Sequence, residues 1–113
     1  MRRGEIWWVD LGSPFGSEPG YRRPAIVVQA DAINKSAIKT VHIVPLTRTM
    51  DWADAPGNLA LRPKATGLKQ VSVANVSQLT VVDRRRLLEK VGDVPGSLMR
   101  ELDDGIKLVL GLS

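Results

Sequence analysis

Short apolar stretches that alternate with polar residues fill most of the chain and predict β-strands. We expect strands at Glu5–Leu11, Ala25–Gln29 and Thr40–Pro45, and shorter ones at Asn58–Arg62, Val71–Val76 and Val91–Val94. In the first stretch, Ile6 and Trp8 point to one face and Trp7 and Val9 to the other, because successive side chains of a strand alternate. Apolar residues occur on both faces, so both are expected to be partly covered.

The end of the chain changes to a helical period. Apolar residues recur there at Leu98, Leu102, Ile106, Val109 and Leu110, which is the spacing of one helix face. Pro95 precedes this helix, Ser97 is expected to cap it, and Gly111 lies just past its end. Gly105 weakens the helix by about 1 kcal/mol relative to alanine, so the helix is expected to gain most of its stability by docking on the sheet.

The segments between these elements are expected to be turns and loops. Asp31 is expected to cap a single helical turn at 31–34, Thr47–Gly57 is a polar loop, and Thr80–Arg86 is a turn region. Short strands separated by glycine and proline turns, with one terminal helix, predict an α+β fold built on a small, strongly curved sheet or barrel. With 113 residues and no internal repeat, the chain is expected to form one domain over residues 1–113.

The composition narrows the range of partners without naming one. The formal charge of +4 and the pI near 9.9 favour an anionic partner, although a solvated basic surface without a partner would have the same charge. The chain has no cysteine, which excludes disulfides, thiolate nucleophiles and cysteine metal sites. It also lacks an apolar run of roughly 20 residues and a secretion signal, so a soluble cytoplasmic protein is expected.

The segment from Gly12 to Gln29 carries the clearest candidate site. Its loop is rich in glycine and proline and contains Glu18 and the pair Arg22 and Arg23, after which Pro24 leads into a core strand. A cationic pair at the edge of a rigid strand suits an anion. Arginine suits phosphate in particular, because its planar guanidinium donates in a bidentate way and keeps its charge.

The sequence offers few residues for a metal site or for a serine–histidine catalytic site. His42 is the only histidine, and a surface or interface position on a strand is expected for it rather than a role as a metal ligand. Asp51 and Asp54 are expected to be solvated. The chain lacks a G-x-S-x-G motif, a Walker motif and a dinucleotide-binding fingerprint, so neither a metal nor a cofactor is expected.

The remaining candidate is a reaction at phosphate that relies on stabilisation of negative charge. Thr47 and Arg48 follow the third strand, and Thr47 would lie near Arg23 if the second and third strands are neighbours. RNA supplies its own nucleophile, the 2′-hydroxyl, so its cleavage needs only positioning, proton transfer and stabilisation of the developing charge. The alternative is that Arg23 only pairs with Glu18 to fix the loop, and that Thr47 only caps a turn.

Other basic and aromatic residues are weaker candidates. The run Arg84–Arg86 beside Asp83 is expected to be a solvated charged face. Trp52, in the polar loop, could stack a base, although a place at the end of the barrel or in a dimer interface is favoured. Trp7 and Trp8 are expected in the core and in an interface.

Four segments that together span nearly the whole chain carry a family resemblance: RRGEIWWVDLGSPFGSEPGYRRPAIVV, VHIVPLTRT, GLKQVSVANVSQL and VGDVPGSLMRELDDGIKLVLGL. In this order they resemble the MazF/PemK toxins of bacterial toxin–antitoxin modules. The resemblance implies an SH3-like or plasmid-toxin barrel, a homodimer, and metal-independent, sequence-specific cleavage of single-stranded RNA such as messenger RNA, which stops translation and growth. It also implies a MazE-like antitoxin whose acidic, disordered segment blocks the RNA groove.

The resemblance also assigns roles to individual residues. Arg23 and Thr47 match the catalytic pair of the family, and Glu18 matches its loop glutamate. The expected RNA-binding positions are Phe15, Ser17, Arg22, Arg48, Lys69, Gln70, Ser72 and Gln78. By this resemblance, the 2′-hydroxyl attacks the adjacent phosphate to give a 2′,3′-cyclic phosphate and a 5′-hydroxyl. The proton acceptor is either Arg23, which is a poor base at its usual pKa, or Glu18.

The sequence departs from the family pattern where bases are read. Pro19 replaces a frequent glutamine, and Gln70 and Val71 replace a basic residue and an aspartate, so the cleavage sequence cannot be taken from a relative. Two interpretations of other classes stay open. One is a CcdB-like poison of DNA gyrase, which has the same fold and acts through its C-terminal helix. The other is an RNA-binding barrel or an inactive homologue that buffers the antitoxin.

Overall fold

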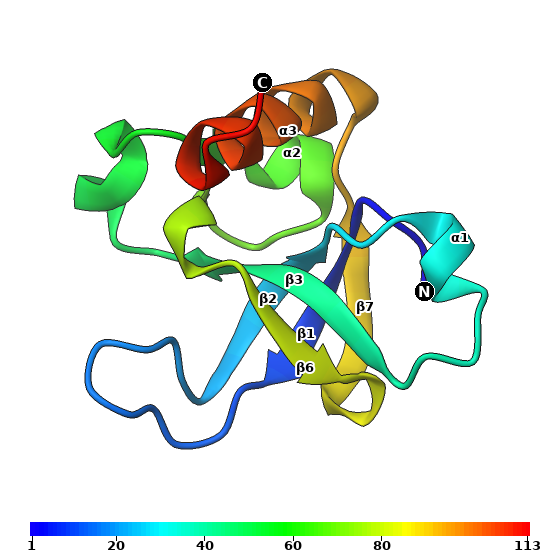
Figure 1. Ribbon diagram of the computed structural model, residues 1–113. Coiled ribbons are helices and arrows are strands. Elements are labelled where there is room, and N and C mark those ends of the chain that lie inside the picture. The colour runs from blue at the N-terminus through cyan, green and yellow to red at the C-terminus, as the bar shows by residue number, and fades with distance from the viewer.

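Five strands form a curled antiparallel sheet in the order β6-β3-β2-β1-β7. Their bounds are Glu5–Asp10 for β1, Arg22–Val27 for β2, Thr40–Thr47 for β3, Thr80–Asp83 for β6 and Leu87–Asp93 for β7. Two short strands, β4 (Leu59–Leu61) and β5 (Ser72–Ala74), continue the sheet from the carboxyl-terminal end of β3. The computed structural model describes residues 1–113, and Figure 1 shows its helix α3 (Gly96–Leu110) lying across the top of the strands.

The alternation of β1 places its side chains in two separate cores, as expected. Ile6 is fully buried in a cluster of 11 residues that includes Leu102 of α3. Val9 is fully buried on the opposite face, in a cluster of five residues that includes Val27 and Ile43. Because both faces of the central strands are covered, the strand ends that carry the candidate site are held on a rigid framework.

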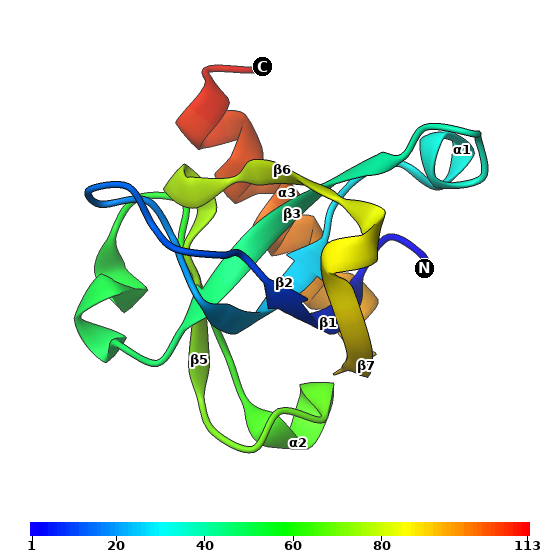
Figure 2. The same ribbon diagram turned by 90° about the horizontal axis from the view of Figure 1, so that it is seen from below.

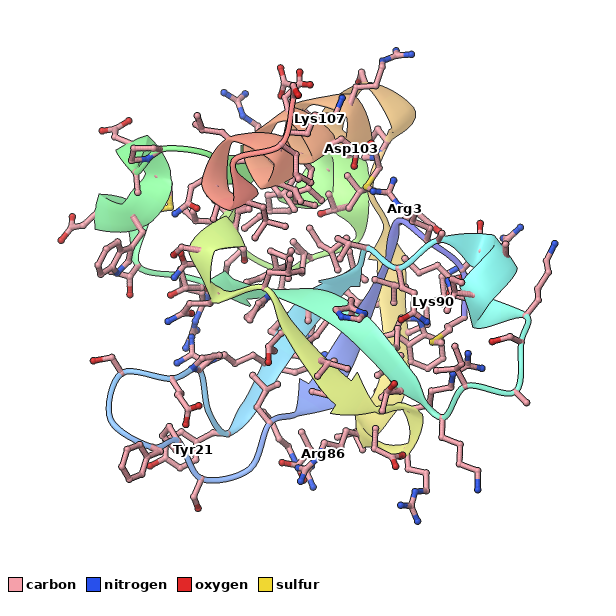
Figure 3. The ribbon with its side chains drawn as sticks, in the orientation of Figure 1. Arg3, Tyr21, Arg86, Lys90, Asp103 and Lys107 are labelled. Atoms are coloured by element: carbon pink, nitrogen blue, oxygen red, sulfur yellow. The ribbon has the colours of Figure 1, made fainter.

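Helix α3 docks on the sheet through four of the five residues of its predicted apolar face, whereas the fifth, Leu110, is exposed. Leu102 is fully buried, whereas Leu98, Ile106 and Val109 are partly buried against the same cluster. The predicted Ser97 cap is wrong, because the helix already begins at Gly96 and no side chain caps its amino-terminal end. Arg3 also ties the start of the chain to α3 by an ion pair with Asp103, and Figure 3 shows the two side chains pointing toward each other.

Five short helical segments occupy the connections. They are α1 (Asp31–Asn34), α2 (Pro63–Thr66) and the 3₁₀ helices η1 (Met50–Asp54), η2 (Val76–Gln78) and η3 (Arg84–Arg86). The predicted capping role of Asp31 is wrong, because Ala30 holds the cap position. The carboxylate of Asp31 instead accepts hydrogen bonds from the backbone amide of Arg3 at 2.7 Å and from Asn34 Nδ2 at 3.1 Å. Asp31 therefore joins the amino-terminal segment to α1.

The strands differ from the sequence-based expectation mainly at their ends. The segment Thr80–Arg86 is not a simple turn, since Thr80–Asp83 forms β6 on the edge of β3 before η3 begins. Strand β7 starts at Leu87 rather than Val91, because it pairs along most of β1. Strand β2 begins at Arg22, so the arginine pair lies within the strand. Strand β3 extends through Thr47, and η1 interrupts the polar loop that follows.

The architecture confirms the predicted α+β class, with a small curved sheet and a carboxyl-terminal helix. In Figure 2, seen from below, the loop between β1 and β2 extends well beyond the strands. None of the helices has the length and the apolar character that crossing a bilayer requires.

Candidate active site

A groove of about 650 Å³ opens where β2 begins and β3 ends, beside the segment between α2 and β5. Its lining residues are Trp8, Gly20, Tyr21, Arg22, Arg23, Pro24, Leu46, Thr47, Arg48, Thr49, Gly67, Leu68, Lys69, Gln70, Ser72 and Val91. Four of these side chains are cationic and none is acidic. Such a one-sided charge distribution in a cleft attracts and orients an anionic ligand.

Arg23 and Thr47 both line this groove, Arg23 near the start of β2 and Thr47 at the end of β3. Strands β2 and β3 are antiparallel neighbours in which Ala25 pairs with Pro45. This pair is the last one between the two strands, but β2 begins at Arg22 and β3 runs through Thr47, so the same register continued by two residues would set Arg23 across from Thr47. The two residues also line the same groove and are both half-buried. Thr47 was expected near Arg23 only if the second and third strands are neighbours, and the structure shows that they are.

The guanidinium of Arg23 is oriented by the backbone and not by an acid. Its Nε donates to the carbonyl oxygen of Gly20 at 3.0 Å, whereas Glu18 Oε1 accepts from the backbone amide of Phe15 at 3.2 Å. The alternative that Arg23 pairs with Glu18 is therefore wrong for this structure. Because one edge of the guanidinium is held and its terminal nitrogens have no carboxylate partner, the group can still bind a phosphate.

The hydroxyl of Thr47 is fixed by a tight turn. Its Oγ1 accepts from the backbone amide of Thr49 at 3.2 Å, which confirms the turn-capping role considered for it. A hydroxyl that accepts one hydrogen bond can still donate its own proton. The same turn brings Arg48 across the groove, where its Nη1 donates to Gln70 Oε1 at 3.2 Å. This contact joins the two walls of the groove.

The structure divides the expected site residues into two groups. Arg22, Arg23, Thr47, Arg48, Lys69, Gln70 and Ser72 line the groove. Phe15, Ser17, Glu18 and Gln78 lie outside it, the first three on the exposed part of the loop between β1 and β2. Gln78 Nε2 donates to the carbonyl oxygen of Ser17 at 3.2 Å, so η2 supports the far end of this loop. Glu18 would reach the groove only if the loop folded over it.

Two aromatic residues of the groove were missed by the sequence analysis. Tyr21 has a left-handed backbone with a φ of 62°, a conformation that costs free energy for a bulky residue and often marks a functional site. Figure 3 shows Tyr21 in the loop just before β2. Trp8 was expected in a core or an interface, but it lines the groove and is 41% exposed. Neither position is visible from sequence alone, since both depend on which strands pair.

The three arginines between β6 and β7, Arg84–Arg86, all form hydrogen bonds with other residues of the chain. The side chain of Arg85 hydrogen-bonds Asp83 and holds the pKa of that carboxyl at about 2. Arg86 Nη1 donates to the carbonyl oxygen of Asp10 at 3.0 Å, and Figure 3 shows this arginine at the lower edge of the sheet. Arg84 Nη2 donates to the carbonyl oxygen of Ile33 at 3.2 Å. These contacts favour a structural role for the run.

The structure contains no cluster of side chains that could bind a metal ion. No three histidine, aspartate or glutamate side chains lie close enough together to share one. His42 is exposed on β3, with its Nδ1 3.0 Å from Gln29 Oε1. Asp51 and Asp54 are exposed on η1. The histidine thus occupies the strand surface position expected for it.

Curated relatives match almost the full length of the chain. Endoribonuclease MazF2 of Mycobacterium bovis is 43% identical over 112 residues, which cover 99% of this chain and 98% of that protein. Endoribonuclease MazF9 of Mycobacterium tuberculosis is 36% identical over 116 residues, with coverage of 99% and 98%.

Solved structures share the fold. MazF from Deinococcus radiodurans superposes with a TM-score of 0.82 at 24% identity and covers 99% of this chain and 97% of that one. An endoribonuclease from a mycobacterial species, in complex with its cognate antitoxin, superposes with a TM-score of 0.75 at 23% identity, with coverage of 100% and 95%. Residues 2–110 match the family described as the PemK-like, MazF-like toxin of type II toxin–antitoxin systems. The family match and the 43% identity together establish that the chain belongs to this toxin family.

Proposed function

We propose that this chain is the toxin of a type II toxin–antitoxin pair and a metal-independent, sequence-specific endoribonuclease that cleaves single-stranded RNA. The observation that carries the proposal is that Arg23 and Thr47, from neighbouring strands, line one groove with four cationic and no acidic side chains. The names of the curated relatives, which are endoribonucleases, support it. Cleavage of messenger RNA would stop translation and growth until an antitoxin neutralises the toxin.

In the proposed reaction, the 2′-hydroxyl of one nucleotide attacks the phosphorus on its own 3′ side. The bond from phosphorus to the 5′-oxygen of the next nucleotide breaks, which leaves a 2′,3′-cyclic phosphate and a 5′-hydroxyl. Arg23 and the hydroxyl of Thr47 donate to the non-bridging oxygens, where negative charge builds in the transition state. Donors that are already in place stabilise this charge without reorganising during the reaction, which is the main source of their catalytic effect.

The reaction also needs a proton acceptor for the 2′-hydroxyl and a donor for the 5′-oxygen. Arginine is a weak base because its guanidinium stays protonated far above neutral pH. Glu18 is the conventional base. Its carboxylate now contacts the amide of Phe15 at 3.2 Å within the loop, so a role for Glu18 requires the loop to close over bound RNA. The pH dependence of a Glu18 variant distinguishes these two cases.

The recognised RNA sequence is expected to be particular to this chain. Gln70 lies on the groove wall, and Pro19 belongs to the loop that would close over the RNA. Both residues depart from the family pattern. The positions that line the groove, Arg22, Arg48, Lys69 and Ser72, are proposed to hold the phosphates and bases on either side of the scissile bond.

The partners follow from the same proposal. A structural neighbour has been solved in complex with its cognate antitoxin, and an acidic antitoxin segment would compete with RNA for the cationic groove. We also propose a homodimer that acts in the cytoplasm, where its RNA substrates are found. Dimer formation would cover some of the exposed apolar side chains, which include Val81 and Leu110.

The proposal is tested by incubating the purified protein with a long, unstructured RNA in the presence of EDTA. Discrete cuts with 2′,3′-cyclic phosphate ends are expected. Binding without cuts would instead indicate an RNA-binding module or an inactive homologue. Inhibition of supercoiling by DNA gyrase, without any RNA cleavage, would indicate a gyrase poison.

A further inference from the structure

Three apolar residues from three adjacent strands, which we call the floor residues, line the groove that Arg23 and Thr47 also line. Trp8 of β1 lies opposite Pro24 of β2. The β2–β3 register, continued by one residue beyond Ala25 and Pro45, sets Pro24 opposite Leu46. All three floor residues line the groove. The groove therefore has an apolar part next to its charged part.

Trp8 is the exposed member of this floor. Its side chain is 41% exposed, whereas Ile6 and Val9 of the same strand are fully buried. Water in contact with a large aromatic surface is unfavourable by about 25 cal/mol per Å². An apolar surface rimmed by polar groups in a concave site is the usual mark of a ligand-binding position. Tryptophan offers the largest flat surface of any side chain for stacking.

The opposite wall is the segment that joins α2 to β5. Gly67 has a φ of +82°, and a Cβ at this position would lie 2.8 Å from the carbonyl oxygen of Val91, so this residue packs on β7 in a way that only glycine permits. Leu68 beside it is buried in the main core cluster. We call the space bounded by Trp8, Pro24, Leu46, Gly67 and Leu68 the base slot.

The rim of the base slot is polar and held in place. Lys69 and Gln70 follow Leu68 on the same wall and line the groove. Gln70 Oε1 accepts from Arg48 Nη1 at 3.2 Å, which orients the amide of Gln70. An apolar floor with polar groups at one edge matches the chemistry of a nucleobase, which has two π-faces and a hydrogen-bonding edge.

We propose that the base slot holds one unpaired nucleobase of the RNA, adjacent to the scissile phosphate and stacked on the indole of Trp8. The inference rests on the proposed function and adds the position at which a base is held. A second copy of the chain is a poorer occupant of this surface. Arg22, Arg48 and Lys69 line the same groove, and two such cationic surfaces would repel each other.

The test combines a substitution of Trp8 with the removal of a single base. A short RNA with one mapped cleavage site is prepared as a series in which each nucleotide in turn is made abasic. Wild type, Trp8→Leu and Trp8→Phe are compared by kcat/KM for cleavage. They are also compared by binding to the same series with 2′-deoxyribose at the cleaved nucleotide. Leu88→Ala is the control, because Leu88 is 46% exposed on β7 outside the groove.

Loss of one base–aromatic stack is expected to weaken binding and kcat/KM of Trp8→Leu by about 5- to 150-fold. Trp8→Phe retains a ring and is expected to lose less, and Leu88→Ala is expected to lose nothing. At one position next to the scissile phosphate, removal of the base is expected to lower the affinity and the kcat/KM of the wild type to the values of Trp8→Leu. The same removal is expected to leave the affinity and the kcat/KM of Trp8→Leu unchanged. Such coupling between a side chain and a base is direct evidence of contact.

The proposal is overturned if Trp8→Leu, with an unfolding temperature close to wild type, binds and cleaves as the wild type does. Equal abasic penalties in wild type and Trp8→Leu at every position would also overturn it. The results distinguish a failure of the base slot from a failure of the proposed cleavage reaction. Coupling in the binding series without any cleavage overturns only the reaction, whereas cleavage without coupling overturns only the base slot.

Discussion

Arg23, near the start of β2, lines the same groove as Thr47, the last residue of the neighbouring antiparallel strand β3. The pairing of the two strands ends at Ala25 and Pro45, two positions away from these residues. A guanidinium and a hydroxyl that line one groove can donate to two oxygens of one phosphate. The pairing of β2 with β3 thus brings the two members of the proposed catalytic pair to one end of the sheet.

Thr47→Val is expected to lower the cleavage rate by about 100- to 1,000-fold, the usual cost of removing one donor to a developing oxyanion. Valine keeps the shape of threonine but has no hydroxyl. Thr47→Ser keeps the hydroxyl, both as a donor and as the acceptor for the amide of Thr49, and is expected to stay within a few-fold of wild type. Single-turnover rates measure both. A Thr47→Val enzyme as fast as the serine variant would remove Thr47 from the mechanism.

Glu18→Gln is expected to slow cleavage by about 100-fold or more, which is the usual contribution of a general base. Glutamine can still accept the hydrogen bond from the amide of Phe15, so the loop is kept while the base is lost. The measurement is the pH dependence of the single-turnover rate. If Glu18 is the base, the acidic limb of the wild-type profile disappears in the variant. A variant profile with an unchanged acidic limb would assign the base role to Arg23.

Gly105→Ala is expected to destabilise the fold, although alanine favours a helix by about 1 kcal/mol. A Cβ at Gly105 would lie 2.1 Å from the carbonyl oxygen of Gly57, and overpacking of this kind costs about 1–3 kcal/mol or more. Urea unfolding measures the difference. Gly96→Ala is the matched control, because no atom lies within 4 Å of its added Cβ. A Gly105→Ala protein more stable than wild type would show that α3 does not pack this closely.

Glu5→Gln tests the pH dependence of stability. Burial raises the pKa of Glu5, but hydrogen bonds from Trp7, the amide of Arg2 and Lys90 lower it by more, so the net pKa lies below its usual value of 4.5. A lowered pKa stabilises the fold above the unfolded-state value, and this contribution disappears as the pH falls through the folded-state value.

The variant is therefore expected to be less stable than wild type at pH 7 by about 1–3 kcal/mol, the cost of hydrogen bonds to a charged group. The two proteins should converge as the pH falls below about 4.5. Urea unfolding between pH 2.5 and pH 7 measures this. Glu101→Gln, at an exposed position of α3, is the control and should follow wild type throughout. A constant difference between wild type and Glu5→Gln would contradict the assigned pKa direction.

Sequence periodicity predicted the elements that are buried on one or both faces. Ile6 and Val9 alternate between the two cores, and Leu102 lies on the docked face of α3. Strand β6 and the first half of β7 were not predicted as strands, because they lie at the edges of the sheet. Exposed apolar residues such as Val81 and Leu88 leave no clear alternation of apolar and polar side chains there. Helix α2 is a single turn and carries no helical period.

The candidate site could be predicted only in part, for a similar reason. The charge and order of Arg22 and Arg23 are visible in the sequence, and the family resemblance singles out Arg23 and Thr47. The place of Trp8 in the groove depends on its pairing with Pro24 and on the packing of the α2–β5 segment. Pairing between strands is a long-range property, so a local pattern cannot reveal it.

The rate of RNA cleavage by Arg23→Ala tests the central claim most directly. It is measured under single-turnover conditions in EDTA, with Arg100→Ala as the control because Arg100 is exposed on α3 away from the groove. We predict a loss of about 100- to 1,000-fold for Arg23→Ala and none for Arg100→Ala. An Arg23→Ala protein that folds normally and cleaves within a few-fold of the wild-type rate would contradict the assignment of Arg23 as the residue that stabilises the reacting phosphate.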